Sequence, residues 1–112
     1  MVVERIGCPD NRNDFKRLMD ELKSHIVIIK CYAEWCGPCN KIKDDIEKQF
    51  DRIRSTDKIM MYIDVDEKQD VAAFLKIRSL PTLISYREGM KHNVMEGSEQ
   101  EKITYFFRNL KK

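Results

Sequence analysis

The sequence predicts an α/β protein, in which a central mixed β-sheet of about five strands is flanked by four helices in the order βαβαβαββα. Residues 26–32 are rich in β-branched side chains, and apolar residues occupy both the odd and the even positions, which face opposite sides of a strand. This is typical of a central strand covered on both faces. Strand-like and helix-like segments then alternate along the first two thirds of the chain. The last third instead has two strands joined by a tight turn, followed by a helix, and this order predicts a mixed sheet between helices.

The first half is expected to contain two strands and two helices. Residues 2–6 predict a short first strand, and residues 11–23 an amphipathic helix with Asn11 among its candidate caps. The strand at 26–32 follows. A second helix comes next, and the apolar stripe that marks it consists of Ile42, Ile46, Phe50 and Ile53.

The second half completes the sheet. We expect strands at 59–65, 82–87 and 91–95, with a turn at Glu88-Gly89 between the last two. A short helix is expected at 70–75. Ser98 and Glu101 have the spacing of a capping box, which places Ser98 at the N-cap of a final helix running through Leu110.

Composition and charge limit the classes of function. The 112 residues suit a single domain spanning 1–112, and 21 basic against 19 acidic residues leave no basic patch for nucleic acid. The longest apolar run, Ile26–Ile29, is too short to span a membrane. A charge appears within the first residues, before a signal peptide could form, so we expect a cytoplasmic protein.

The four cysteines are unevenly spaced, with Cys36 and Cys39 in a C-x-x-C motif and Cys8 and Cys31 apart from it. In a reducing compartment this pattern indicates catalysis or a metal site. A second C-x-x-C or a histidine pair that would complete four zinc ligands is missing, so we expect no metal. Cys31 is expected in the core. Cys8, before Pro9, is expected to be an incidental surface thiol, open to oxidation.

The C-x-x-C motif follows the central strand and starts a helix, because Pro38 suits a first helical turn. The free N–H groups and positive dipole end at this position favour a thiolate at Cys36, with a pKa moved from about 8.5 towards about 3.5–7.5. Cys36 is therefore the expected nucleophile. Cys39, one turn deeper and less accessible, is expected to resolve the mixed disulfide.

Residues 33–39, with the sequence A-E-W-C-G-P-C, resemble the active-site signature of the thioredoxin family, A-x-W-C-G-P-C. Residues 63–66 and 69–72 look like the third strand of that family and its following helix, and residues 80–82 match its x-P-T. Gly89 and Gly97 fall where the family has turn glycines. The resemblance extends from about residue 26 to the C-terminus and implies the thioredoxin fold.

The resemblance also implies roles for residues around the cysteines. Trp35, Gly37 and Pro38 would form an apolar rim that contacts substrate. Leu80 would offer its backbone to an extended substrate segment, before a cis peptide bond to Pro81. The implied function is a protein-disulfide reductase that needs no cofactor of its own, acts on protein disulfides as a monomer, and receives electrons from a thioredoxin reductase.

The sequence departs from the family at three positions. Lys30 stands where the family usually has a buried Asp that assists proton transfer at the second cysteine, and Tyr62 and Asp44 replace the family's usual Lys and Pro. A buried Lys30 would have a lowered pKa, and we expect it to slow or retune resolution by Cys39. This departure leaves open a second reading, a thioredoxin-fold interaction or regulatory module with weak redox activity. An oxidase or isomerase is the third reading, which the missing signal peptide and the Gly-Pro between the cysteines disfavour.

Overall fold

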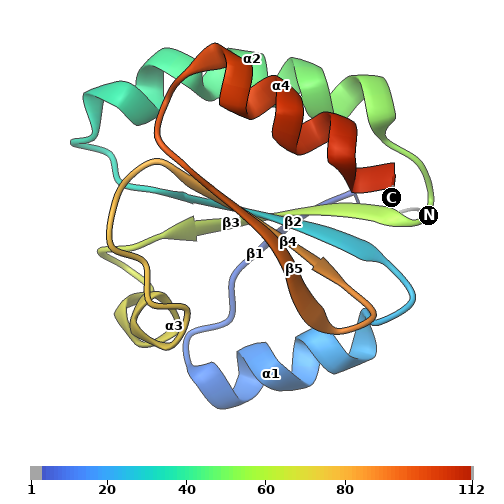
Figure 1. Cartoon of the computed structure of the whole chain (residues 1–112). Coiled ribbons are helices and arrows are strands. Elements are labelled where there is room, and N and C mark those ends of the chain that lie inside the picture. The colour runs from blue at the N-terminus through green and yellow to red at the C-terminus, as the bar shows by residue number, and fades with distance from the viewer. Residues whose placement is uncertain (1–3, 112) are drawn as a thin grey trace.

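The fold is built on one five-stranded mixed sheet, which we describe in a computed structural model covering residues 4–111 (Figure 1). The strands are β1 (Arg5–Gly7), β2 (Ile26–Tyr32), β3 (Lys58–Asp64), β4 (Thr82–Arg87) and β5 (Met90–Glu96). They lie in the order β1-β3-β2-β4-β5. β3 runs parallel to both β1 and β2, whereas β4 runs antiparallel to β2 and β5. β2 is therefore the central strand, as its sequence predicts.

In the described part of the chain, four helices cover the two faces of this sheet. They are α1 (Arg12–Glu21), α2 (Gly37–Ile53), α3 (Gln69–Phe74) and α4 (Gln100–Arg108), the last continued by a 3₁₀ turn at Asn109–Lys111. α1 and α3 lie against one face, and α2 and α4 against the other (Figure 1). The predicted α/β sandwich is thus confirmed. Between residues 4 and 111, no helix has the length and apolar character needed to cross a membrane.

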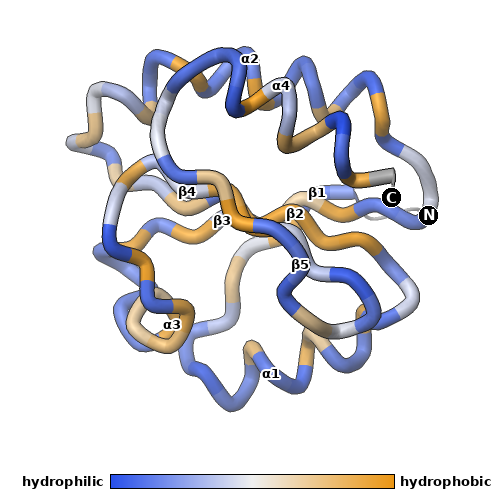
Figure 2. The backbone as a smooth tube through the Cα atoms, viewed as in Figure 1, coloured by the Kyte–Doolittle hydropathy of each residue, from blue (hydrophilic) through white to orange (hydrophobic). Residues whose placement is uncertain are grey.

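Alternation along β2 divides the interior into two apolar cores. Ile29 is fully buried in the core beneath α1 and α3, while Ile28 is fully buried in the core beneath α2 and α4. The central strands and the inward helix faces are accordingly hydrophobic, whereas the outward helix faces and much of the edge strand β5 are hydrophilic (Figure 2). The same alternation places Lys30 on the α2 side, where it is the one buried charged residue among those described.

The start of β1 and the N-terminus of α4 differ from the sequence predictions. β1 begins at Arg5 rather than at residue 2, and residues 2 and 3 lie outside the described part. The predicted capping box is wrong, because Glu99 is the N-cap of α4 and makes no side-chain capping bond. The chain turns at Gly97 with φ 108°, so that Ser98 lies one residue too early, and the Glu99 carboxylate pairs with Lys102 at 3.4 Å instead.

Candidate active site

Cys36 and Cys39 lie at the start of α2, directly after the central strand. They form a disulfide with a Cα–Cα distance of 5.3 Å. Cys36 is the N-cap of α2, its Sγ accepts a hydrogen bond from the Cys39 N–H at 3.1 Å, and Pro38 lies in the first turn. The sulfur of Cys36 therefore sits where unpaired helical N–H groups and the helix dipole stabilise negative charge.

Exposure does not distinguish the two cysteines. Each is 3% exposed, so the predicted greater accessibility of Cys36 is not seen in the disulfide form. The difference lies in what each faces. Cys36 lines an open groove of about 540 Å³, and Cys39 lines a separate cavity of about 680 Å³ that it shares with Lys30. We call these the Cys36 groove and the Lys30 cavity.

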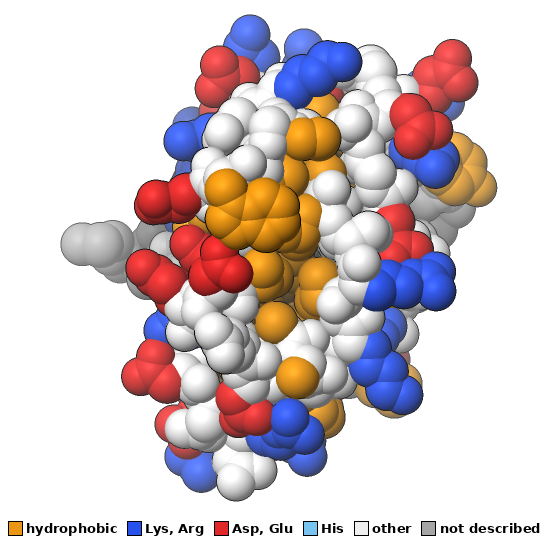
Figure 3. Space-filling model, turned by 90° about the vertical axis from the view of Figure 1, so that its left-hand side faces the viewer, with side chains coloured by type: hydrophobic (Ala, Val, Ile, Leu, Met, Phe, Trp, Pro, Cys, Tyr) orange, Lys and Arg blue, Asp and Glu red, His pale blue; other side chains and the backbone are white. Residues whose placement is uncertain are grey.

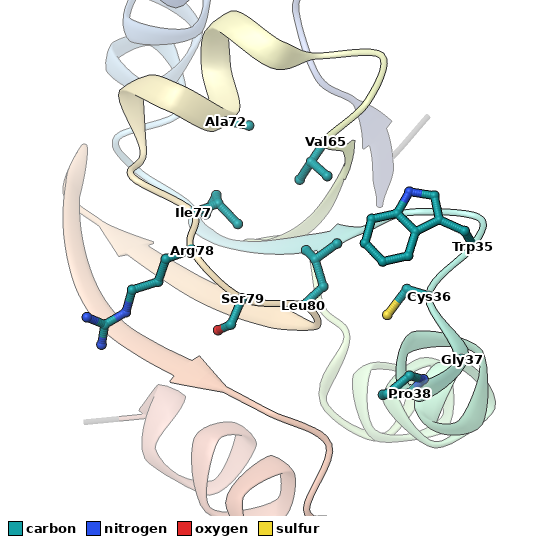
Figure 4. A pocket seen from close by; sticks show the side chains of 10 residues that line it. All are labelled: Trp35, Cys36, Gly37, Pro38, Val65, Ala72, Ile77, Arg78, Ser79 and Leu80. Carbon is teal, nitrogen blue, oxygen red and sulfur yellow. The ribbon is translucent and has the colours of Figure 1, made fainter.

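The Cys36 groove is mainly apolar. Its hydrophobic side chains form a strip across this face of the molecule, and the close-up shows them running along the groove to the Cys36 sulfur at one end (Figures 3 and 4). The residues that line it include Trp35, Gly37, Pro38, Val65, Ile77 and Leu80. An apolar floor beside a nucleophilic sulfur suits the contact of an extended protein segment that carries a disulfide.

Trp35 and Leu80 flank the sulfur from opposite sides of the groove (Figure 4). Trp35 is 71% exposed, and its indole N–H donates to the Asp66 carboxylate at 2.7 Å, which fixes the ring. The Leu80–Pro81 peptide bond is cis. Within residues 4–111, neither the N–H nor the C=O of Leu80 makes a backbone hydrogen bond, so both are available to a β-like partner.

Lys30 lies behind the cysteines, between two tyrosine rings. It is 4% exposed, and its Nζ lies 5.8 Å from the ring centroid of Tyr32 and 5.6 Å from that of Tyr62. No carboxylate in the described structure pairs with it directly. Burial lowers the pKa of the Lys30 amine, and the nearby Glu47 carboxylate partly opposes this. Burial in this cavity therefore favours the neutral form of the amine more than exposure to solvent would.

Glu47 ties this cavity to the outer strand of the sheet. Its carboxylate accepts hydrogen bonds from the Tyr62 hydroxyl at 2.8 Å and from Arg5 Nε at 3.0 Å. Burial, together with the bond to Glu47, raises the pKa of Tyr62 to about 12, so this hydroxyl remains a donor at neutral pH. Glu47 also raises the pKa of Lys30 more than Asp44 does, so it is the carboxylate that contributes most to stabilising a protonated Lys30.

Cys8 and Cys31 belong to the core between the sheet and helices α1 and α3. Cys31 is fully buried, as predicted, and burial raises its pKa to about 12. The prediction of a surface thiol at Cys8 is wrong, since this residue is only 6% exposed and burial raises its pKa to about 11. The loop after β1 folds inward there, and the Cys8 thiol donates to the Pro9 carbonyl at 3.2 Å.

Three residues of the site were not predicted from the sequence: Asp66, Glu47 and Arg78. Asp66 follows β3, and because carboxyl ends of neighbouring parallel strands meet at one sheet edge, its closeness to Trp35 after β2 was open to prediction. Glu47 and Arg78 give no comparable signal, because an exposed charge on a helix or loop is usually solvated. Within residues 4–111, no group of three or more His, Cys, Asp or Glu is placed to hold a metal ion.

A redox-active cysteine pair at a helix start, facing an apolar groove, defines a thiol–disulfide oxidoreductase. Comparison with known proteins agrees. The sequence profile of the thioredoxin family matches residues 8–109, and the Gallus gallus thioredoxin is 31% identical over 109 residues, covering 97% of this chain and 99% of that protein. The chain belongs to the thioredoxin family and is a protein-disulfide oxidoreductase.

Solved structures show the same fold. The Malassezia sympodialis thioredoxin superposes with a TM-score of 0.82 at 25% identity, over 100% of this chain and 97% of that one. The reduced Schistosoma mansoni thioredoxin pre-protein superposes with a TM-score of 0.80 at 24% identity, over 96% of this chain and 98% of that one. The predicted thioredoxin fold is therefore confirmed over essentially the whole chain.

Proposed function

We propose that this chain works as a reductase of protein disulfides, with Cys36 as nucleophile and Cys39 as resolving cysteine. The observation that carries the proposal is the position of Cys36, which caps α2 and faces the apolar Cys36 groove while Cys39 faces away from it. A substrate sulfur in the groove reaches Cys36 first. Trp35, Pro38 and Leu80 would contact the substrate segment around it.

The reaction is two successive exchanges. The Cys36 thiolate attacks the substrate disulfide, that S–S bond breaks, and the departing substrate sulfur takes up a proton, leaving a mixed disulfide. Cys39 then loses its proton and attacks the Cys36 sulfur, which breaks the mixed disulfide and releases the second substrate thiol. The protein dithiol gives up two electrons and two protons, and the substrate gains both.

The proposal also covers the electron donor, the cellular location and the oligomeric state of the chain. Thioredoxin-family proteins receive electrons from a thioredoxin reductase, and we assign such a donor to this chain. A cytoplasmic location is supported by Cys8 and Cys31, because unpaired thiols beside a redox pair suit a reducing compartment. A monomer is supported by the edge strand β5, whose exposed Lys91 and His92 disfavour pairing with another sheet edge.

Lys30 is assigned the task of accepting the proton that Cys39 must lose. The two residues line the same cavity, and the lowered pKa of the amine leaves it free to take up a proton. Glu47 then stabilises the ammonium that forms. Removing the amine in Lys30→Met should slow resolution and move its pH dependence upward, because Cys39 must then ionise unaided. Rapid-mixing measurement of mixed-disulfide decay across pH tests this, and an unchanged profile contradicts it.

Reduction of insulin disulfides by dithiothreitol tests the proposed function as a whole. Catalytic amounts of the chain should accelerate the reaction strongly, and Cys36→Ser should abolish the acceleration. A folded, fully reduced protein without activity would refute the reductase and support the interaction module, since a thioredoxin domain that only binds needs no turnover. Cys8→Ser is the matched control, because it removes a buried thiol outside the redox pair.

A further inference from the structure

Acidic side chains gather along one side of the Cys36 groove, next to Trp35. Figure 3 shows red side chains crowded at one edge of the hydrophobic strip. Four carboxylates lie around Trp35 and the adjoining Tyr32, namely Glu34, Asp64, Asp66 and Glu67, and we call them the acidic edge. Glu34 adjoins Trp35 in sequence, and Asp66 accepts the indole N–H at 2.7 Å. These contacts bring the acidic edge within reach of a bound substrate.

Tyr32 links the rest of the acidic edge to the cysteines. Its ring packs against the small cluster that contains Cys36 and Cys39. Burial raises the pKa of Tyr32 first, and the negative charges of Asp64, Glu67 and Glu34 raise it further. Charges near enough to act on this hydroxyl also act on a substrate segment in the groove, since both lie beside the cysteine pair.

Basic residues near the groove do not offset these charges. Within residues 4–111, none of the acidic-edge carboxylates forms a salt bridge. Lys68 pairs with Asp10. Arg78, which lines the groove, donates two hydrogen bonds of 3.0 Å to Glu96. Lys68 and Arg78 are thus matched by partners of their own. Lys30 and Lys43 line the separate Lys30 cavity rather than the groove, so the groove side of the acidic edge retains a negative field.

We propose that the Cys36 groove selects disulfides carried on basic segments, with Lys or Arg flanking the substrate cysteine. This inference rests on the proposed reductase function and adds a substrate class to it. The apolar strip holds the segment, and the acidic edge attracts its positive charges and repels acidic segments. Such complementarity acts mainly on the rate of encounter and weakens as salt screens the charges.

Two disulfide peptides provide the test. They are identical except that Lys in one and Glu in the other flank the cysteine on both sides, so the direction of binding need not be known. The second-order rate of reduction by the pre-reduced chain is measured at low and high salt. At low salt we expect the Lys peptide to react about fivefold to tenfold faster, a range typical of modest steering, and we expect high salt to shrink the ratio.

Matched variants assign the effect to the acidic edge. Glu34→Gln/Glu67→Gln removes two exposed charges without touching the Trp35–Asp66 bond, and should bring the Lys-to-Glu rate ratio down about threefold. Asp20→Asn/Glu21→Gln removes equal charge from the end of α1 that points away from the start of α2, and should leave the ratio unchanged (Figure 1).

Each outcome has one meaning. Equal rates for the two peptides at low salt overturn the proposal, as does a rate ratio that falls equally in both double variants. If neither peptide is reduced while insulin also remains intact, the reductase function itself has failed. If both peptides are reduced at equal rates, the reductase function is supported and only the preference for basic segments is refuted.

Discussion

Replacing Lys30 with Met should stabilise the fold at neutral pH. Lys30 is 4% exposed and has no direct ion-pair partner among the described residues, so burial disfavours the charged form of its amine. Methionine has a similar unbranched stem and can occupy the same space between Tyr32 and Tyr62. The substitution therefore removes a buried amine whose charged form burial penalises, while keeping most of the packing.

The magnitude follows from two opposing effects. Relief of the cost of burying the amine, which the native state meets either by desolvating the cation or by releasing its proton, contributes about 3 kcal/mol. Loss of the contacts between the cation and the two rings costs about 1–2 kcal/mol in total. Lys30→Met should therefore raise the free energy of unfolding by about 1–2 kcal/mol near pH 7.

The pH dependence gives a sharper test of the same reasoning. Because burial lowers the pKa of Lys30 in the folded protein, the unfolded chain binds an extra proton between the folded pKa and about 10.4. Raising the pH through this window stabilises the native protein relative to the variant. The advantage of Lys30→Met should thus be largest near neutrality and disappear by about pH 11.

Urea unfolding of both proteins at several pH values measures this difference. The groups that face Lys30 are Tyr32, Tyr62, Glu34, Glu47, Lys43 and Asp44, and all are present in both proteins. Their titration therefore largely cancels in the comparison. A variant that is less stable at neutral pH, or a difference that does not change with pH, would refute the assignment of Lys30 as an uncompensated buried amine.

Three other predictions follow from the site and the core. Cys39→Ser should trap a covalent complex between Cys36 and substrate, seen on non-reducing gels; failure to trap would show that Cys39 does not resolve. Cys8 and Cys31, with pKa values of about 11 and 12, should resist iodoacetamide near pH 8, where about one Cys8 thiol in a thousand is ionised. Mass spectrometry should find both labelled only after unfolding, and rapid native labelling would contradict their burial. Ile46→Ala should destabilise the fold by about 2–5 kcal/mol in urea, because Ile46 is fully buried on the inner face of α2, and a loss below about 1 kcal/mol would contradict tight packing there.

Local patterns in the sequence were sufficient for most of the elements. The apolar run that became β2 and the 82–87 segment that became β4 were predicted with their observed bounds. Asn11 caps α1, as its position before the amphipathic stretch predicted. These features depend on hydrophobic period and on caps within a few residues, and such short-range effects can be read along the chain.

The sequence by itself determined the redox pair and the element that presents it, because a C-x-x-C followed by helical periodicity after a buried strand depends only on neighbouring residues. Only the tertiary structure decided that Cys8 turns inward and that Glu47 acts on the buried Lys30. Each of these depends on which distant segments pack together. Burial, pKa and hydrogen-bond partners are set by that packing, and residue type alone does not specify it.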